Sequence, residues 1–280
     1  MLNPQLSLNC RGRLLSLDVP IVMGILNITP DSFFSGSRID NLDSLLKLAE
    51  KMLKEGATIL DIGGMSSRPG ANIIPLEEEL LRVIPAIEAI HQRFPEAFIS
   101  IDTIRAEVAR KAVNAGASII NDISAGKLDE QMFPTVADLN VPYILMHMKG
   151  RPENMQELPS YEDVSLEILD FFIEHIARLR ALNVKDIILD PGFGFGKTVK
   201  HNFRLLKELH IFKVLDLPLL AGISRKSMIC KALKVNPPAA LNGTTALHMV
   251  ALQQGSHILR AHDVKEANEV IQLWQELESV

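Results

Sequence analysis

The amino-acid sequence predicts a (β/α)8 barrel, an α/β fold in which eight parallel strands close into a ring inside eight helices. Short apolar runs alternate with amphipathic stretches, and eight such pairs follow one another at a spacing of about 30 residues. No low-complexity linker or change of composition divides the 280 residues, so a single domain over residues 1–280 is expected. A doubly wound open sheet is the alternative, and the count of eight pairs favours closure.

The predicted strands are the eight apolar runs, at residues 21–26, 58–62, 98–101, 118–120, 143–146, 187–189, 217–221 and 257–259. The predicted helices carry apolar residues at helical spacing. They lie at 42–53, 80–90, 108–115, 131–139, 164–179 and 205–209, followed by a pair at 226–233 and 238–253. The last helix is expected to begin at Asp263, whose carboxylate can cap it while Glu266 completes a capping box. The first ~18 residues precede the repeat and are expected to form a short hairpin that closes the bottom of the barrel.

Charge and composition exclude several classes of protein. The net charge is −5 and no block of lysine and arginine occurs, so a nucleic-acid partner is not expected. No apolar run approaches the ~18 residues of a membrane span, and the first residues lack a signal-peptide pattern. The two cysteines, Cys10 and Cys230, have no zinc-like spacing and make no disulfide framework. We therefore expect a cytoplasmic protein without membrane contact.

A glycine-rich loop from Asp190 to Lys197 directly follows the sixth apolar run. It is not a Walker A loop, because Pro191 stands where that loop needs a glycine. It is not a dinucleotide fingerprint either, because Val199 stands at the position of the third glycine. Asp190 nevertheless stands at the carboxyl end of a predicted strand, where α/β enzymes bind their ligands.

Polar side chains stand at the carboxyl ends of all eight predicted strands, which converge on one mouth in a barrel. In chain order they are Asn27, Asp61, Asp102, Asn121, His147, Asp190, Lys226 and Arg260, with His262 beyond the last. A single Asp or Asn at such a position is more often a helix cap, but a complete set indicates a binding site. His147 has no second histidine at helical spacing and is interpreted as a packed or hydrogen-bonded rim residue rather than a metal ligand.

One part of this set suits a heterocycle. Asp102, Asn121 and Asp190 supply hydrogen-bond acceptors, which match a ring that carries an amide N–H beside an amino group. Lys226 can donate to a ring carbonyl.

The other part suits a phosphate group. Asn27, Arg260 and His262 are expected to form a second cluster at the opposite rim, where the Arg260 guanidinium can fork onto phosphate oxygens. Barrel phosphate sites often involve the loops after strands seven and eight. The two clusters together suggest a diphosphate ester of a heterocycle.

The chain resembles the dihydropteroate synthase family over essentially its full length. The matching segments are 23–33 (MGILNITPDSF), 60–64 (LDIGG), 66–70 (SSRPG), 100–103 (SIDT), 120–123 (INDI), 190–197 (DPGFGFGK), 222–226 (GISRK) and 259–264 (LRAHDV). The resemblance implies a TIM barrel, a homodimer, and condensation of 7,8-dihydropterin-6-ylmethyl diphosphate with p-aminobenzoate in folate biosynthesis. It also implies a transferase that is the target of sulfonamides.

The resemblance assigns roles to the residues that match. Those implied to hold the pterin are Asp102, Asn121, Asp190 and Lys226. Of the pair Met146 and Met148 that flanks His147, one is expected to lie against the pterin and the other to pack under a helix, and Met146 and Phe195 are assigned to the substrate site. Those implied at the diphosphate are Asn27, Ser67, Arg68, Arg260 and His262, with Asn27 also ligating a magnesium ion. Those implied to shape the p-aminobenzoate site are Phe33, Ser67, Arg68, Pro69 and Ser227. The catalytic set is Asn27, Lys226, Arg260 and His262. Ser227 would meet the p-aminobenzoate carboxylate at a helix N-terminus, which offers free N–H groups to an anion.

Two positions depart from the family pattern Gly-Gly-Glu-Ser-Thr-Arg-Pro-Gly. Met65 replaces the glutamate and Ser67 replaces the threonine. Ser67 keeps the hydroxyl, whereas Met65 removes a charge near the second loop, which bears on loop stability and drug contacts more than on activity.

The predicted mechanism is a dissociative, SN1-like substitution, because no Cys, Ser or Lys is paired with a base to act as a nucleophile. Two alternatives stay open. A methyltetrahydrofolate methyltransferase-like enzyme also reads a pterin in a barrel, but it would have no diphosphate for Arg260 and His262 to hold. A catalytically inactive pterin-binding protein is supported only by Met65.

Overall fold

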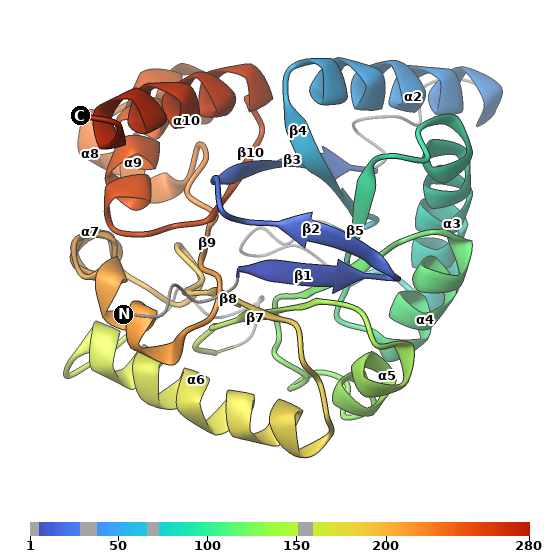
Figure 1. Ribbon diagram of the computed structural model, residues 1–280, viewed down its shortest axis with the longest axis horizontal. Coiled ribbons are helices and arrows are strands. Elements are labelled where there is room, and N and C mark those ends of the chain that lie inside the picture. The colour runs from blue at the N-terminus through green and yellow to red at the C-terminus, as the bar shows by residue number, and fades with distance from the viewer. Residues whose placement is uncertain (1–5, 29–37, 66–72, 151–158) are drawn as a thin grey trace.

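Eight parallel strands form one ring, with helices around its outside (Figure 1). The computed structural model describes residues 6–28, 38–65, 73–150 and 159–280. The strands are hydrogen-bonded in the order β8-β7-β6-β5-β4-β3-β10-β9. The two edge strands meet at a parallel bridge between Leu189 and Leu219, where Leu189 N donates to Pro218 O at 2.8 Å. The predicted barrel is confirmed.

The elements alternate along the chain as expected. The barrel strands are β3 (Ile21–Asn27), β4 (Ala57–Gly63), β5 (Phe98–Asp102), β6 (Ile119–Asp122), β7 (Tyr143–Met146), β8 (Ile187–Asp190), β9 (Leu220–Ala221) and β10 (Ile258–Ala261). The helices are α2 (Arg38–Lys54), α3 (Leu76–Arg93), α4 (Ala106–Ala115), α5 (Met132–Leu139), α6 (Val164–Ala181), α7 (Val199–Lys207), α8 (Ser227–Leu233), α9 (Leu241–Gln253) and α10 (Val264–Glu278). Two 3-10 helices, η1 (Leu209–Leu215) and η2 (Pro237–Ala240), follow α7 and α8.

Some predicted boundaries are wrong. The seventh strand, predicted at 217–221, is reduced to Leu220–Ala221, because Pro218 has no N–H to donate to a ladder. β4 continues to Gly63, so Asp61 lies inside the barrel rather than at the strand end.

The predicted capping box at the last helix is also wrong. Asp263 is the N-cap residue of α10, but its side chain makes no capping bond. Both of its carboxylate oxygens instead accept from Arg225, whose Nε and Nη2 lie 2.8 and 2.7 Å away. The guanidinium group fits a carboxylate with two parallel hydrogen bonds. Asp263 therefore connects the loop after β9 to the start of α10 instead of capping the helix.

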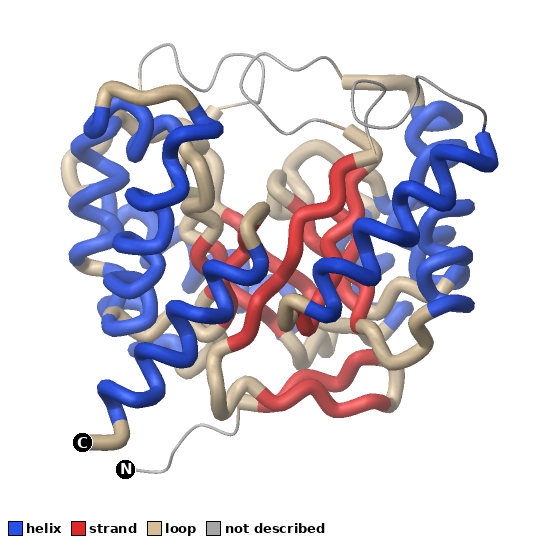
Figure 2. Tube along the Cα trace, turned by 90° about the horizontal axis from the view of Figure 1, so that it is seen from above, coloured by secondary structure: helices blue, strands red, loops and turns tan. Residues whose placement is uncertain are grey.

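The N-terminal hairpin closes the bottom of the barrel, as predicted. β1 (Ser7–Cys10) and β2 (Arg13–Ser16) pair antiparallel and lie across one end of the strands (Figure 2). The buried hairpin residues share an apolar cluster with one residue from seven of the barrel strands. They are Leu8, Cys10, Leu15 and Leu17, and the strand residues are Met23, Ile59, Ile119, Ile144, Ile188, Leu220 and Ile258. The barrel interior therefore has an apolar floor.

A polar layer lies directly above this floor. Side chains two positions apart on a strand face the same side of a sheet, so the next inward residues follow from the apolar ones. They are Asp61 on β4, Asn121 on β6, Asp190 on β8 and Arg260 on β10. All the barrel strands run in the same direction, so these side chains converge on one mouth.

Candidate functional site

Asp190 and Lys226 face each other across Gly222 at the ends of β8 and β9. A Cβ atom at Gly222 would lie 3.8 Å from Asp190 Oδ2 and 3.9 Å from Lys226 Nζ. Asp190 Oδ1 accepts from Gly192 N at 2.8 Å. Burial raises the pKa of Asp190, and burial lowers the pKa of Lys226 to about 8 although Asp190 opposes that change. The space left by Gly222 is thus lined by one acceptor and one donor.

Asp102, Asn121 and Arg260 are brought together by a fourth residue, Asp61. Asp61 Oδ2 accepts from Asn121 Nδ2 at 3.1 Å and from Arg260 Nε at 2.6 Å. Arg260 Nη2 donates to Asp102 Oδ2 at 2.9 Å. Burial raises the pKa of Asp102 to about 7, with Arg260 opposing the shift and Asp61 adding to it.

The prediction that the ring-binding cluster and the phosphate-binding cluster lie at opposite rims is wrong, because Arg260 of the second cluster bonds to Asp102 of the first. Arg260 reaches across to the carboxylates of β4 and β5, because two buried acids need a cation nearby. Asn27 and Arg260 stand on the adjacent strands β3 and β10, which agrees with their expected cluster. The two predicted clusters are one continuous site.

Lys197 holds the glycine-rich loop from inside. Its buried Nζ lies 3.0 Å from His147 Nδ1, 2.9 Å from Gly192 O and 3.0 Å from Phe195 O. Burial lowers the pKa of Lys197 well below its usual range. The interpretation of His147 as a hydrogen-bonded rim residue agrees with this contact.

The glycines of this loop are required by the path of the backbone. Gly192, Gly194 and Gly196 have φ angles of +68°, +87° and +62°, a region that favours glycine. A side chain at Gly192 or Gly196 would also overlap the carbonyl oxygen of His147 or Lys149. The glycines therefore let the loop pass close to the end of β7.

Met146 and Phe195 line the same mouth. Both belong to a small apolar cluster with Ile104, Ile123 and Met148. The Phe195 ring centroid lies 4.6 Å from Lys226 Nζ. An apolar wall therefore stands beside the donor and acceptor pair.

Three predicted residues stand at the outer rim. Asn27 is half-buried at the end of β3, and its Oδ1 would lie 3.5 Å from a Cβ atom at Gly63. His262 Nδ1 lies 3.1 Å from Ser224 Oγ. Ser227 is exposed as the first residue of α8. The remaining predicted residues, Phe33, Ser67, Arg68 and Pro69, lie outside the described residues.

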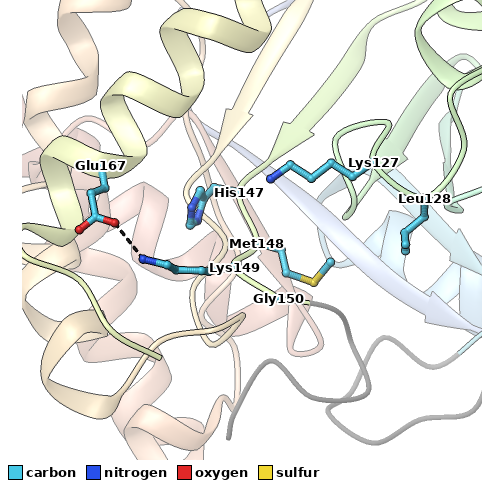
Figure 3. A pocket seen from close by; sticks show the side chains of 7 residues that line it. All are labelled: Lys127, Leu128, His147, Met148, Lys149, Gly150 and Glu167. Carbon is cyan, nitrogen blue, oxygen red and sulfur yellow. Dashed lines mark hydrogen bonds and ion pairs between the residues drawn. The ribbon is translucent and has the colours of Figure 1, made fainter. Parts of the chain in front are cut away.

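A cavity of about 480 Å³ lies beside this mouth (Figure 3). It is lined by Lys127, Leu128, His147, Met148, Lys149, Gly150 and Glu167. Lys149 Nζ pairs with Glu167 Oε2 at 2.9 Å. None of the four residues expected to read the ring lines this cavity. The buried polar layer, with its convergent donors and acceptors, is the better candidate for the site.

The described residues contain no group of three or more His, Cys, Asp and Glu side chains arranged to hold a metal ion. Among them, no helix is long and apolar enough to cross a membrane.

Sequence reasoning missed two members of the site. The sequence places Asp61 at a predicted strand end, and its place two residues after the inward-facing Ile59 indicates an inward carboxylate. Lys197 stands at the end of a loop in the sequence. Its buried position depends on the fold, and no signal in the sequence distinguishes it from a solvated lysine.

Comparisons with known proteins agree on one family. A family model described as "Pterin binding enzyme" matches residues 23–262. The dihydropteroate synthase of Escherichia coli (strain K12) is 48% identical over 271 residues, covering 96% of this chain and 95% of that protein. A Yersinia pestis dihydropteroate synthase structure with a sulfonamide drug complex superposes with a TM-score of 0.91 at 45% identity, covering 98% and 100% of the two chains. A Xanthomonas albilineans dihydropteroate synthase in complex with 7,8-dihydropteroate gives a TM-score of 0.88 at 39% identity, covering 98% and 99%.

Proposed function

This chain belongs to the family of pterin-binding enzymes and, within it, to the dihydropteroate synthases, and from this premise we propose how its residues carry out the reaction. The enzyme condenses 7,8-dihydropterin-6-ylmethyl diphosphate with p-aminobenzoate to give 7,8-dihydropteroate and diphosphate. The relatives favour this synthase over a methyltransferase. The observation that carries the assignment of the site is the meeting of the buried Asp102, Asn121 and Asp190 with the partly exposed Lys226, which faces Asp190 across Gly222.

The pterin ring is bound by several hydrogen-bond acceptors and one hydrogen-bond donor. Asp190 accepts the ring amide N–H and the neighbouring amino group, because a carboxylate can take two parallel hydrogen bonds. Lys226 donates to the ring carbonyl across the space that Gly222 leaves. Asp102 and Asn121 accept from the other edge, while Met146 and Phe195 pack against the ring faces.

The diphosphate is held by the cationic side of the mouth. Among the described residues, Arg260 donates from Nε to Asp61 and from Nη2 to Asp102, and its Nη1 hydrogens are proposed to bind an anion. His262 follows two residues after Arg260, directly past the end of β10. Asn27 Oδ1 is a hard oxygen donor of the type magnesium accepts, and a magnesium ion bound there together with diphosphate oxygens would supply charge neutralisation to the leaving group.

The reaction breaks the bond between the pterin methylene carbon and the diphosphate oxygen, and the electron pair leaves with diphosphate. Arg260 and His262 stabilise the charge that develops on that oxygen. The electron-rich ring, held by Asp190 and Lys226, spreads the positive charge left on the methylene carbon. The amine of p-aminobenzoate then forms the new carbon–nitrogen bond and loses a proton. Ser227 at the start of α8, with Phe33, Ser67, Arg68 and Pro69, is proposed to hold the p-aminobenzoate.

The proposed enzyme is cytoplasmic and a homodimer. The exposed apolar side chains of Leu233 at the end of α8 and Leu273 and Leu277 on α10 support an interface on this side of the barrel. Light scattering of the purified protein tests the dimer, and a monomer at micromolar concentration would remove it.

Formation of 7,8-dihydropteroate from the two substrates with magnesium tests the proposed activity. The purified chain should form product, and the folded Arg260→Ala variant should lower kcat by roughly 10²–10³. A folded wild-type protein that forms no product would support the inactive pterin-binding protein instead.

A further inference from the structure

Asp61 is a fully buried carboxylate that no substrate role accounts for. It stands in the polar layer between the apolar floor and the mouth of the barrel. Its Oδ2 accepts two hydrogen bonds, one from Asn121 and one from Arg260. These two partners belong to the ring-reading side and the diphosphate side of the site, so one carboxylate oxygen joins the two halves.

We propose that Asp61 is a positioning residue that decides which end of the Asn121 amide faces the pterin ring and how the Arg260 guanidinium is turned toward the diphosphate. The inference rests on the proposed function of this site. Its basis is the geometry of three side chains from β4, β6 and β10 that meet at Asp61 Oδ2.

The amide of Asn121 has two chemically different ends, one an acceptor oxygen and the other a donor NH2 group. A carboxylate oxygen only accepts, so the Asn121 end that meets Asp61 must be the NH2 group. Asn121 Oδ1 then has to point the other way. The ring therefore meets an acceptor at this position, which suits its N–H groups.

The same oxygen fixes Arg260. Nε donates to Asp61 and Nη2 donates to Asp102, so two of the three guanidinium nitrogens are held in one plane. The Nη1 edge is the one left for an anion. Without Asp61, Arg260 could rotate about its remaining contact and the fork would lose its direction.

Two buried polar atoms near this junction lack a hydrogen-bond partner within the described part of the chain. They are Asp61 Oδ1 and Ser100 Oγ, on residues that are register partners in β4 and β5. A single bound water could join the hydroxyl and the carboxylate oxygen, because a water needs two or more polar partners. An apolar residue at position 61 would remove one of these two polar atoms and leave Ser100 Oγ without it.

Removing and restoring the shared acceptor oxygen tests the proposal. Asp61→Leu removes the oxygen that Asn121 and Arg260 share, so both side chains lose their fixed orientation. Asp61→Asn is the conservative variant, because its amide oxygen can take the place of Oδ2 and accept from both partners while its NH2 group faces Ser100 Oγ, which has no partner among the described residues. The double variant Asp61→Leu with Asn121→Ala measures how much of the effect passes through Asn121.

The probe is 6-hydroxymethylpterin, titrated calorimetrically into the wild type, Asp61→Leu, Asp61→Asn, Asn121→Ala and the double variant. We expect Asp61→Leu to weaken binding by about tenfold or more, as for the loss of a matched buried hydrogen bond, and Asp61→Asn to keep most of the affinity. The double variant should lose less affinity than the two single losses combined, which is the sign of a direct partnership. If Asp61→Leu does not fold, Asp61→Glu, which keeps the charge but moves the oxygen by one methylene, should show the same loss.

Asp122→Leu is the matched control. Asp122 is equally buried and adjacent to Asn121, but it belongs to the opposite face of β6, where its carboxylate accepts from Ser124, Gly126 and Tyr143. This variant should keep its pterin affinity. Wild-type affinity in Asp61→Leu, an equal loss in Asp61→Asn and Asp61→Leu, or losses in the double variant that equal or exceed the sum of the single losses, would overturn the role of Asp61. A wild-type protein that does not bind the pterin at all would instead overturn the proposed function.

Discussion

Replacing Arg260 with methionine should destabilise the protein by an amount that depends on pH. The change keeps the apolar stem but removes the cation from between Asp61 and Asp102, which are both buried. Removing one partner of a buried ion pair costs roughly 3–5 kcal/mol, because the other charge is left without compensation. Asp102 can relieve part of this cost, since its pKa is already raised to about 7 by burial and rises further without Arg260.

The direction in which the free energy of unfolding changes with pH follows from proton binding. Between the ordinary pKa of an aspartate and the raised pKa in the folded variant, the folded state holds a proton that the unfolded state has lost. The stability of the variant therefore falls as pH rises through this window. The wild type shares this dependence up to about pH 7, because its own Asp102 has a pKa of about 7. Relative to the wild type, we therefore expect the loss to grow only above about pH 7, and to be larger at about pH 8 than at about pH 5.5 by roughly 1 kcal/mol.

Urea unfolding at both pH values measures this difference in the free energy of unfolding. Arg225→Met is the control, since it also breaks a bidentate pair, with Asp263, at a partly exposed position. The pKa of Asp263 is lowered by Arg225, so the stability that this pair contributes is lost only in acid below this window. An equal loss for Arg260→Met at both pH values would refute the reasoning about the buried carboxylates.

Three further predictions concern the ring and its loop. Asp190→Asn should weaken pterin binding at least tenfold in calorimetry, because an amide NH2 would face a ring donor at a cost of ~1–3 kcal/mol; unchanged binding would remove Asp190 from the site. Gly192→Ala should lower the free energy of unfolding by well over ~1 kcal/mol, because it adds an overlap with His147 O to a left-handed backbone. Gly12→Ala, with φ +85° and no atom within 4 Å, should show the backbone strain alone, and equal losses would mean that the overlap does not matter. The affinity for 6-hydroxymethylpterin should be highest between about pH 7 and about pH 8, since Asp102 must be ionised to accept and Lys226 must be protonated to donate; a flat profile from about pH 6 to about pH 9 would contradict these roles.

Strand–helix alternation predicted the barrel, and the polar strand ends predicted most of the site. This works because parallel strands bring their carboxyl ends to one mouth whatever the details of packing. The pairing of Arg260 with Asp61 and Asp102 could not be predicted, because it depends on how far β4 continues and on a side chain crossing from β10 to β4 and β5. The role of Asp263 was missed because the fork of Arg225, distant in sequence, competes for the carboxylate that local reasoning assigned to a helix cap.

A crystal structure of the protein with 7,8-dihydropterin-6-ylmethyl diphosphate and magnesium, without p-aminobenzoate, tests the central claim most directly. The pterin ring should lie between Asp190 and Lys226 in the space beside Gly222, with the Asn121 oxygen toward the ring and the Arg260 Nη1 edge toward the diphosphate. Electron density for the ring in the cavity lined by Lys127, His147 and Lys149, with the polar layer holding only water, would contradict the account.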